Sequence, residues 1–456
     1  MAVAAPVKDQ MPPRLSGRRP VAGHTVEFLR NPVGLLERGL AERGRVFSLR
    51  LGNRDAVVLL GPEHHDFFFS ETDKLLSIST AYPFFVEMFG ARFWYFAGHD
   101  EWRRQRALVV PRFQGRQLEG YVAAMAAETD TLMDRLGAEG SFDLVPTLGP
   151  LVMRIAGRAF LGEEFSARLG EGFFTEFRKF SGGMEPVLPL WLPLPRLLRS
   201  KRARAGLHRT LGALIAERRR QPLDPPDFLQ TLAGSRYADG TEVPDEVLVN
   251  LILLLTWAGH ETTAGHISWA LADLLSHPGY LAEVLAEQDA AVGGPGADGV
   301  PSAEELAQLR HIDWALHETE RLHPVAFVQM RTAAQAFAYQ GHTVPEGAMV
   351  LISPAVAHRL PDVYPEPHRY LPARHDSAEA PSAGGAGMAK LIGFGGGVHR
   401  CLGVHFAYLE MKVILTLLLR RYQLQLLDPN PKPVPGAKTK WPASPCRVAY
   451  RLRSCM

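Results

Sequence analysis

The sequence predicts a mostly helical α+β fold, and two observations support this prediction. Short segments near both ends of the chain alternate apolar and polar residues, which is typical of β-strands. Most of the chain between residues 62 and 330 repeats its alanines and leucines with the period of a helix. A long helical body, with small sheets built from the two ends, accounts for both patterns.

The individual elements follow in order along the chain. Residues 44–61, GRVFSLRLGNRDAVVLLG, predict a β-hairpin around the GNRD turn. Residues 182–198 place prolines among large apolar side chains, which excludes a continuous helix and indicates a mobile connection over a pocket. Residues 331–353 again read as strands with glycine and proline turns. A last helix is expected over about residues 402–421, and two or more strands close the chain.

The composition is that of a globular enzyme. Hydrophobic residues make up 46% and charged residues 21% of the 456 positions. With 50 basic and 48 acidic residues, the net charge of +2 gives no support for binding to nucleic acid. The three cysteines, Cys401, Cys446 and Cys455, are too few for a disulfide framework and indicate a reducing, cytoplasmic compartment.

Apolar runs that would indicate a membrane segment are short or interrupted. Residues 1–20 lack the apolar core of a signal peptide. The run NLILLLTW, residues 250–257, is followed by glycine and polar residues, so it predicts a buried helix. We therefore expect a soluble, cytoplasmic protein without a transmembrane segment, with a flexible segment at residues 1–20 and a single domain over residues 21–456.

The most informative segment is residues 244–279, which predict one long helix from Pro244 to the His-Pro-Gly at its end. Its middle carries Gly259 and Gly265, each costing about 1 kcal/mol relative to alanine. Four consecutive polar residues, His260 to Thr263, interrupt the apolar face there. A kinked helix with satisfied side chains explains the pattern, and so does a flat ligand that approaches the backbone.

A zinc-protease reading of His260-Glu261 fails. The motif H-E-x-x-H requires a second histidine one turn later, where this chain has Ala264.

A second candidate motif is LRHIDWALHETERLHPV, residues 309–325. Glu318 and Arg321 lie three residues apart on a predicted helix that stops before Pro324. Arg369 follows in a rigid, proline-rich coil. Two arginines around one carboxylate predict a buried network that locks the coil to the helix.

Cys401 lies in FGGGVHRCLG, behind three glycines, and the residues alone leave its role open. A zinc site or a disulfide would need a companion cysteine, and none lies near Cys401 in the sequence. The residues around Cys401 also match no local signature of a catalytic nucleophile. An inert buried cysteine is the plain alternative. A thiolate ligand to haem also fits, because glycine amides and a following helix stabilise a thiolate and leave room for a macrocycle.

Four motifs in this sequence resemble those of the cytochrome P-450 superfamily. Phe394, Gly397, Cys401 and Gly403 match its haem-binding signature F-x-x-G-x-x-x-C-x-G. AGHETT, residues 258–263, is similar to the oxygen-activation motif of the central helix. Glu318, Arg321 and Arg369 resemble the core triad, and Trp102-x-x-x-Arg106 resembles the haem-propionate helix. The motifs occur in the family's order and span roughly residues 30–450.

The resemblance implies the P-450 fold, a triangular helical body with small β-sheets and haem b between the long central helix and the cysteine loop. It implies that Cys401 is the axial ligand of the haem iron. Thr262 and Glu261 are implied as catalytic residues that support O2 activation and proton delivery. The other cofactor-binding residues that it implies are His399, Arg331, Arg106, Trp102, Tyr82, Phe394, Gly395, Ala258 and Gly403.

The expected substrate pocket is apolar and aromatic. Its implied residues are Tyr82, Phe84, Phe85, Phe89, Trp257, Ala258, Val325, Phe327 and Val328, together with the 184–192 segment.

The implied function is insertion of one oxygen atom from O2 into a bulky apolar molecule, such as a terpenoid, sterol or polyketide of secondary metabolism. Electrons are expected from separate chains, a ferredoxin and its reductase. The sequence also looks like the soluble bacterial sterol 14α-demethylases, but those usually carry histidine where this chain has Glu261. A peroxide-driven hydroxylase or isomerase and a non-catalytic haem protein are the remaining alternatives, and the Glu261–Thr262 pair argues against both.

Overall fold

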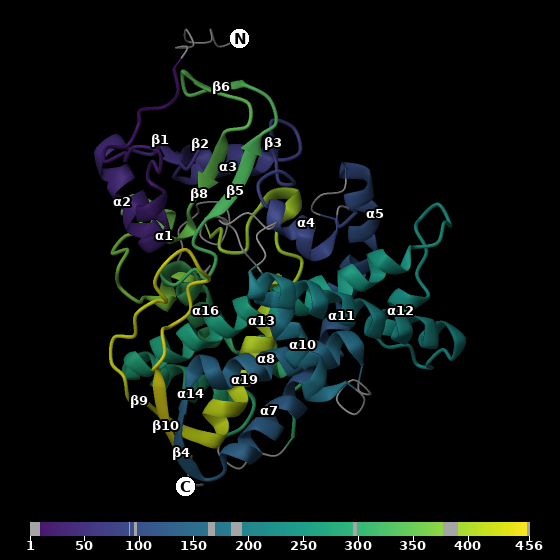
Figure 1. Ribbon diagram of the computed structural model, residues 1–456. Helices are drawn as coiled ribbons and strands as arrows, with labels where there is room; N and C mark the ends of the chain where they lie inside the picture. The colour runs from purple at the N-terminus through teal and green to yellow at the C-terminus, as the bar shows by residue number, and fades with distance from the viewer. Residues whose placement is uncertain are drawn as a thin grey trace.

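The computed structural model describes residues 10–90, 92–94, 98–162, 169–183, 194–294, 299–376 and 391–453, without the side chains of Phe84, Glu87, Arg116 and Glu171. A helical body fills most of the molecule (Figure 1). The sheet containing β1, β2, β5 and β8 lies beside α1 and α2 at one end, and β4, β9 and β10 lie at the opposite end. The predicted fold class is confirmed.

The helices are α1 Thr25–Arg30, α2 Pro32–Arg43, α3 Pro62–Ser70, α4 Pro83–Phe89, α5 His99–Val109, α6 Arg116–Glu119, α7 Val122–Leu136, α8 Leu144–Leu161, α10 Gly170–Ser181, α11 Pro195–Arg220, α12 Phe228–Ala233, α13 Asp245–Ser276, α14 Pro278–Ala291, α15 Ala303–Gln308, α16 Arg310–Leu322, α17 Pro354–Ala357 and α19 Val404–Arg421. Three short 3-10 helices are η1 Val110–Phe113, η2 Pro372–His375 and η3 Gly397–His399. The strands are β1 Val46–Leu51, β2 Arg54–Leu59, β3 Leu76–Ser77, β4 Glu139–Asp143, β5 Gln329–Ala333, β6 Phe337–Tyr339, β7 His342–Val344, β8 Met349–Ile352, β9 Tyr422–Leu426 and β10 Arg447–Leu452.

The main sheet joins the two ends of the chain in the order β1-β2-β8-β5-β3. β1 and β2 form the predicted antiparallel hairpin, with Leu51 opposite Arg54 next to the turn. β2 then pairs in parallel with β8, which sets Ala56 beside Met349. β5 pairs antiparallel with β8, so the chain after α16 enters the sheet at Gln329. The sheet thereby fixes the start of β5 next to the candidate site described below.

Part of the N-terminal segment that is expected to be flexible packs against β1. Leu15 is 2% exposed, its amide donates to the Ser48 carbonyl, and the Ser48 amide donates to the Pro13 carbonyl. The segment therefore satisfies the backbone groups of an otherwise open strand edge, and one apolar side chain anchors it in the core.

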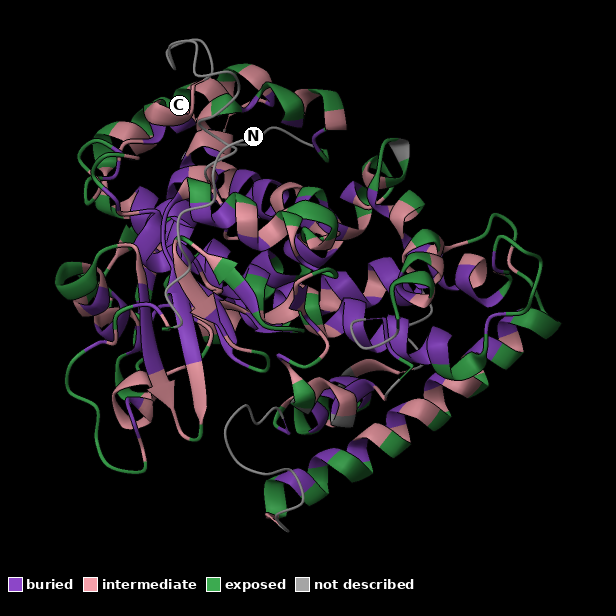
Figure 2. Cartoon of the chain, turned by 90° about the horizontal axis from the view of Figure 1, so that it is seen from above, coloured by how far each residue is buried: buried purple, intermediate pink, exposed green. Residues whose placement is uncertain are grey.

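α13 is the central helix, and α8 packs along it. Buried residues lie mainly in the middle of the molecule (Figure 2), and most residues of α13 are among them. In the described part of the chain, α8 and α13 are long and apolar enough to cross a membrane, but about 67% of each apolar window is buried inside the protein. Their apolar residues are thus accounted for by core packing.

Glu318 and Arg321 form a buried ion pair on α16, and both side chains are 0% exposed. The Arg321 guanidinium donates twice to Glu318 (2.9 and 2.8 Å) and also to the backbone carbonyls of His358, Pro367 and Arg369. All five of its N–H groups point into this fork-shaped arrangement. Although burial alone would raise the pKa of Glu318, hydrogen bonds from Arg321 and His375 lower it to about 2.

The prediction that Arg369 completes this network is wrong. The Arg369 side chain is largely exposed and pairs with Glu366, and only its backbone carbonyl touches Arg321. Arg374, at η2, takes the expected place and donates from Nε to Glu318 (3.1 Å), beside His375 Nε2 (2.9 Å). Pro372 starts a 3-10 turn that swings Arg374 inward, whereas Arg369 follows Glu366 on the solvent side.

Arg374→Ala should lower the midpoint of thermal unfolding clearly, and Arg369→Ala should hardly change it. The first variant removes a hydrogen bond to a fully buried carboxylate, a loss of about 2 kcal/mol. The second removes an exposed pair worth less than about 1 kcal/mol. Equal effects of the two variants, measured by circular dichroism, would contradict this assignment.

Candidate active site

The middle of α13 is more exposed than the two ends of this helix. Almost every residue from Val247 to Thr256 and from Thr263 to Leu274 is buried. Between these stretches, Ala258 and Thr262 are exposed, and a Cβ placed on Gly259 would meet nothing within 4 Å. Because exposed atoms have no protein against them, an unfilled volume adjoins this turn of the helix.

Thr262 lies on the exposed side of that turn. Its Oγ1 donates to the Ala258 carbonyl (2.6 Å), which is the bond back to a helical carbonyl that the sequence analysis anticipates. Thr256 makes the same bond to Ile252 (2.9 Å), one and a half turns earlier, but is fully buried. The two threonines therefore make the same bond to the helix backbone, but Thr256 is buried in the core and Thr262 is exposed.

Cys401 is exposed and yet lies deep in the molecule, as expected for a group that faces an internal space. Burial raises the pKa of its thiol, while a hydrogen bond from the Gly403 amide and the nearby Arg106 and Arg400 act in the opposite direction. The Cys401 amide donates to the Phe394 carbonyl (2.9 Å), which closes the loop on itself. α19 begins three residues later, at Val404.

The glycines before Cys401 make room for Phe69, whereas the sequence suggests that they make room for a macrocycle. A Cβ on Gly396 would lie 2.6 Å from the Phe69 ring, and one on Gly397 would lie 3.0 Å from the Phe69 carbonyl. Gly395 and Gly397 also have positive φ, at 74° and 61°. The glycines thus let the loop turn tightly against α3, and this packing, more than clearance for a cofactor, explains Gly396.

Trp102 and His399 lie together at the edge of the site. Their rings are 4.7 Å apart, and the Arg106 guanidinium lies 5.5 Å from the Trp102 ring. The Trp102 indole Nε1 is buried and has no hydrogen-bond partner among the described residues. A buried N–H without a partner costs about 1–3 kcal/mol, so this donor fits a bound group that carries an acceptor.

Asp73 is a residue of the site that the sequence analysis missed. It accepts from His399 Nε2 (2.6 Å) and lies 3.4 Å from His99 Nδ1. Although burial alone would raise the pKa of Asp73, its bonds to His399 and His99 lower it. His399 is therefore held by a carboxylate in this structure. No sequence signal marks Asp73, which itself has a positive φ of 69° in the turn before β3.

Tyr82 directly precedes α4, and Arg331 lies in β5. The Met330 amide donates to the Tyr82 hydroxyl (2.9 Å), and burial raises the pKa of that phenol. Arg331 is 4% exposed, donates to Thr72 Oγ1 (3.2 Å) and lies over the Phe68 ring. The pair thus joins α4, α3 and β5 on one side of the open space.

Aromatic rings adjoin the start of the exposed turn. Phe85 lies 5.3 Å from Trp257 and stacks on Tyr82 at 5.8 Å, and Phe89 follows 6.3 Å from Trp257. Phe89 is 0% exposed and belongs to the core, whereas Phe85 and Trp257 are partly exposed. Four predicted pocket residues are thus brought together by α4 and α13.

The remaining predicted pocket residues have other neighbours. Phe327 packs near Phe28 and Lys440, and Val328 packs on the N-terminal core. Val325 lies against Gly265 of α13. The 184–192 segment and the Phe84 side chain lie outside the described residues.

Glu261 points toward the C-terminal loop. It is partly buried, burial raises the pKa of its carboxyl, and a hydrogen bond with Thr439 opposes that shift. The same loop is tied to α13 and to the segment after α16, since the Lys440 carbonyl accepts from Trp269 Nε1 (2.7 Å) and the Lys440 amide donates to Val325 (2.9 Å). Glu261 and Thr262 thus leave the helix in different directions.

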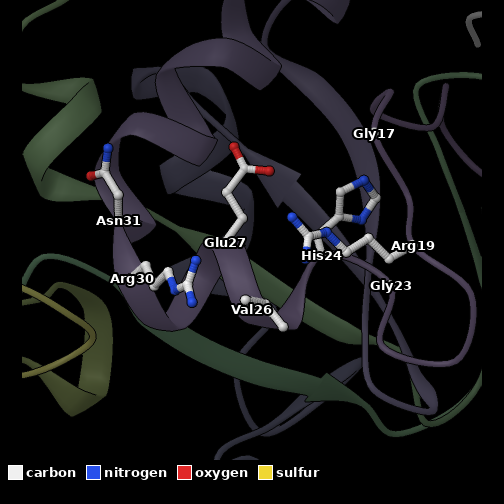
Figure 3. A pocket seen from close by; sticks show the side chains of 8 residues that line it. All are labelled: Gly17, Arg19, Gly23, His24, Val26, Glu27, Arg30 and Asn31. Carbon is white, nitrogen blue, oxygen red and sulfur yellow. The ribbon is translucent and has the colours of Figure 1, made fainter.

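A separate hollow near the N-terminus has a different character. It has a volume of about 220 Å³ and is lined by Gly17, Arg19, Gly23, His24, Val26, Glu27, Arg30 and Asn31 (Figure 3). Glu27 pairs with Arg38 (2.8 Å), and the His24 ring is bonded to the Ser16 carbonyl. Its charged lining does not suit a flat apolar macrocycle.

An exposed cysteine on a glycine-rich loop, with the unpartnered Trp102 donor and Arg106 near the same loop, is compatible with the class of haem-thiolate proteins. The family model for Cytochrome P450 matches residues 12–445. The chain belongs to the cytochrome P450 family.

Proteins similar to this chain come from several kingdoms. It is 30% identical to the sterol 14alpha-demethylase of Mycobacterium tuberculosis over 451 residues, 97% of this chain and 98% of that protein. It is also 30% identical to the sterol 14-demethylase of Arabidopsis thaliana over 93% of this chain and 88% of that protein. The solved structure "Retinoic acid bound cyanobacterial CYP120A1" matches with a TM-score of 0.86 at 25% identity, covering 98% of this chain and all of that one.

The family assignment establishes an oxidoreductase, a P450 monooxygenase, and members of this family bind haem b through a cysteine thiolate. The residues present fit that cofactor, since Cys401 offers the only described thiol that is not buried, and the turn of α13 at Ala258, Gly259 and Thr262 is not filled by other side chains. Trp102 Nε1 supplies an unused donor at the rim.

Cys401→Ala should abolish the red-shifted Soret band of the reduced, carbon-monoxide-bound protein, because that band requires a thiolate ligand. Cys446→Ala is the matched control: Cys446 is fully buried, and its side chain is not part of the site. Absorption spectra of the two purified variants check the prediction. A normal band in Cys401→Ala would overturn the ligand assignment.

Proposed function

We propose that this P450 inserts one oxygen atom from O2 into a bulky apolar substrate of the sterol, terpenoid or polyketide type, with hydroxylation as the outcome. The electrons come from separate chains, a ferredoxin and a ferredoxin reductase, and the reaction takes place in the cytoplasm. The observation that carries the proposal is the exposed turn of α13, with Ala258 and Thr262 beside Phe85 and Trp257.

The aromatic cluster supports an apolar substrate. Rings of Tyr82, Phe85 and Trp257 adjoin the exposed turn, and they offer hydrocarbon surface apart from the Tyr82 hydroxyl, already bonded to Met330, and the buried Trp257 Nε1–H. Aromatic surfaces of this kind gain roughly 25 cal/mol for every Å² of apolar area that a substrate covers. The solved relative with bound retinoic acid supports the same class, because a retinoid is a terpenoid-type molecule.

Haem, when bound, supplies the O2-activating iron centre, and this chain's residues hold it and deliver protons. The Thr262 hydroxyl donates its hydrogen to the Ala258 carbonyl and keeps two lone pairs, so on the exposed face it can accept a hydrogen bond from water or a bound group and take part in proton delivery. Glu261 has a raised pKa, which keeps a fraction of the carboxyl protonated nearer neutral pH. Release of its bond to Thr439 would let it act as the proton donor.

Sterol 14α-demethylation is the second candidate, because relatives with that name match at 30% identity over nearly the whole chain. Glu261, where those enzymes usually carry histidine, favours general hydroxylation.

Thr262→Ala should lower the yield of product per reductant consumed at least severalfold, because proton delivery at the exposed turn is lost. Thr256→Ala should leave this ratio unchanged, although it removes the same bond to a helical carbonyl. Measuring NAD(P)H or reduced ferredoxin consumed against product formed tests both. Full coupling in Thr262→Ala would contradict the proposed proton delivery.

Trp257→Ala should weaken binding of a bulky sterol or retinoid by about tenfold or more, while a substrate small enough to leave the aromatic cluster is affected less. The measurement is the low-spin to high-spin shift of the haem spectrum during titration with a sterol, a retinoid and a monoterpene. Binding of the monoterpene alone would contradict the proposed substrate class, and a shift with lanosterol would favour the second candidate.

A further inference from the structure

Glu320 is a buried acid beneath the cysteine loop that the mechanism above does not use. It lies between Glu318 and Arg321 on α16 and is 6% exposed, but its side chain leaves the helix in another direction. Its Oε1 accepts from the Gly393 amide (3.0 Å) and its Oε2 from the Tyr408 hydroxyl (2.6 Å). Glu320 thereby connects α16, the start of the cysteine loop and α19.

The loop is fitted closely to this carboxyl group. A Cβ on Gly393 would lie 2.7 Å from Glu320 Oε1, so only glycine allows the loop this approach. The Phe394 amide also bonds toward Glu320, and the Phe394 carbonyl accepts from the Cys401 amide (2.9 Å). Glu320 therefore holds the loop at Gly393 and Phe394, seven to eight residues before Cys401. Phe394 links the two groups, because its amide bonds to Glu320 and its carbonyl accepts from the Cys401 amide.

The charge of Glu320 is poorly compensated. Within the described part of the chain, no lysine, arginine or histidine forms an ion pair with it, in contrast to Glu318. Burial raises the pKa of Glu320 to about 7, although the Tyr408 and Gly393 donors lower it somewhat. A glutamine at position 320 would fill the same space as the glutamate without carrying a charge.

We propose that Glu320 is a positioning residue of the cysteine loop whose ionised form disfavours reduction of the haem held by Cys401, so that its protonation makes reduction easier. The physical reason is electrostatic: reduction adds an electron to the haem–thiolate unit, and a nearby carboxylate in a medium of low dielectric constant repels it. This inference depends on the family's haem ligation and is independent of the substrate.

Several other charged or titratable groups act on Glu320. They are Arg400 on the cysteine loop, Tyr408 on α19, Tyr364 and His358 on the coil after β8, and Cys401 itself. Burial lowers the pKa of His358 to about 3 and raises the pKa values of Tyr364 and Tyr408 well above the usual range. Apart from Cys401, which haem would hold as thiolate, none of the groups with a shifted pKa changes charge between pH 5.5 and 8.5.

The test is a spectroelectrochemical titration of the substrate-free, haem-loaded protein between pH 5.5 and 8.5. In the wild type, the balance of oxidised and reduced protein should move toward the oxidised form as pH rises through about 7. Glu320→Gln should remove this transition and favour the reduced form at pH 8.5 by about tenfold. Glu346→Gln, which removes an exposed acid from the turn before β8, should titrate like the wild type.

Tyr408→Phe provides a second, directional test, and it decides the question if Glu320→Gln does not fold. Loss of the Tyr408 donor removes a bond that stabilises the carboxylate, so the transition should move to higher pH without disappearing. Parallel pH profiles for the wild type and Glu320→Gln, or an unmoved transition in Tyr408→Phe, would overturn the proposal. A purely structural role predicts those profiles together with lower thermal stability.

Discussion

The buried ion pair of Glu318 and Arg321 is the interaction on which the site depends. Arg321 binds three carbonyls of the coil after β8, and Glu318 accepts from Leu371, Arg374 and His375. Removing either partner would leave a charge buried without compensation, at a cost of about 3–5 kcal/mol. The pair thereby holds the coil against α16, which itself packs on α13.

α13 combines two buried ends with an exposed middle turn. Its two apolar ends are buried, whereas Ala258, Gly259 and Thr262 adjoin open space. A helix interior with glycine and exposed small residues costs stability, and the long buried stretches on either side compensate for it. The turn can therefore remain open for a cofactor, O2 and substrate without loss of the helix.

Much of this architecture could be predicted from the sequence because it has local periodicity. The hairpin at residues 44–61, the helix after Pro244 and the last helix after Cys401 all fall close to their predicted bounds. Contacts made by the folded chain gave no such signal: Asp73 reaches His399 across 326 positions, and Glu261 turns to Thr439. Arg374 instead of Arg369 was recognisable only from Pro372, which starts the turn that directs it inward.

The parallel pairing of β2 with β8 has a consequence for synthesis of the protein on the ribosome. Ala56 in β2 can pair with Met349 in β8 only after nearly three hundred further residues have been synthesised. At about 5–20 residues per second, the open edge of β2 is unpaired for roughly 15–60 seconds. During that interval the nascent hairpin presents a strand edge to other chains. Slow translation or a crowded polysome should therefore favour aggregation of the nascent chain before β8 has been synthesised.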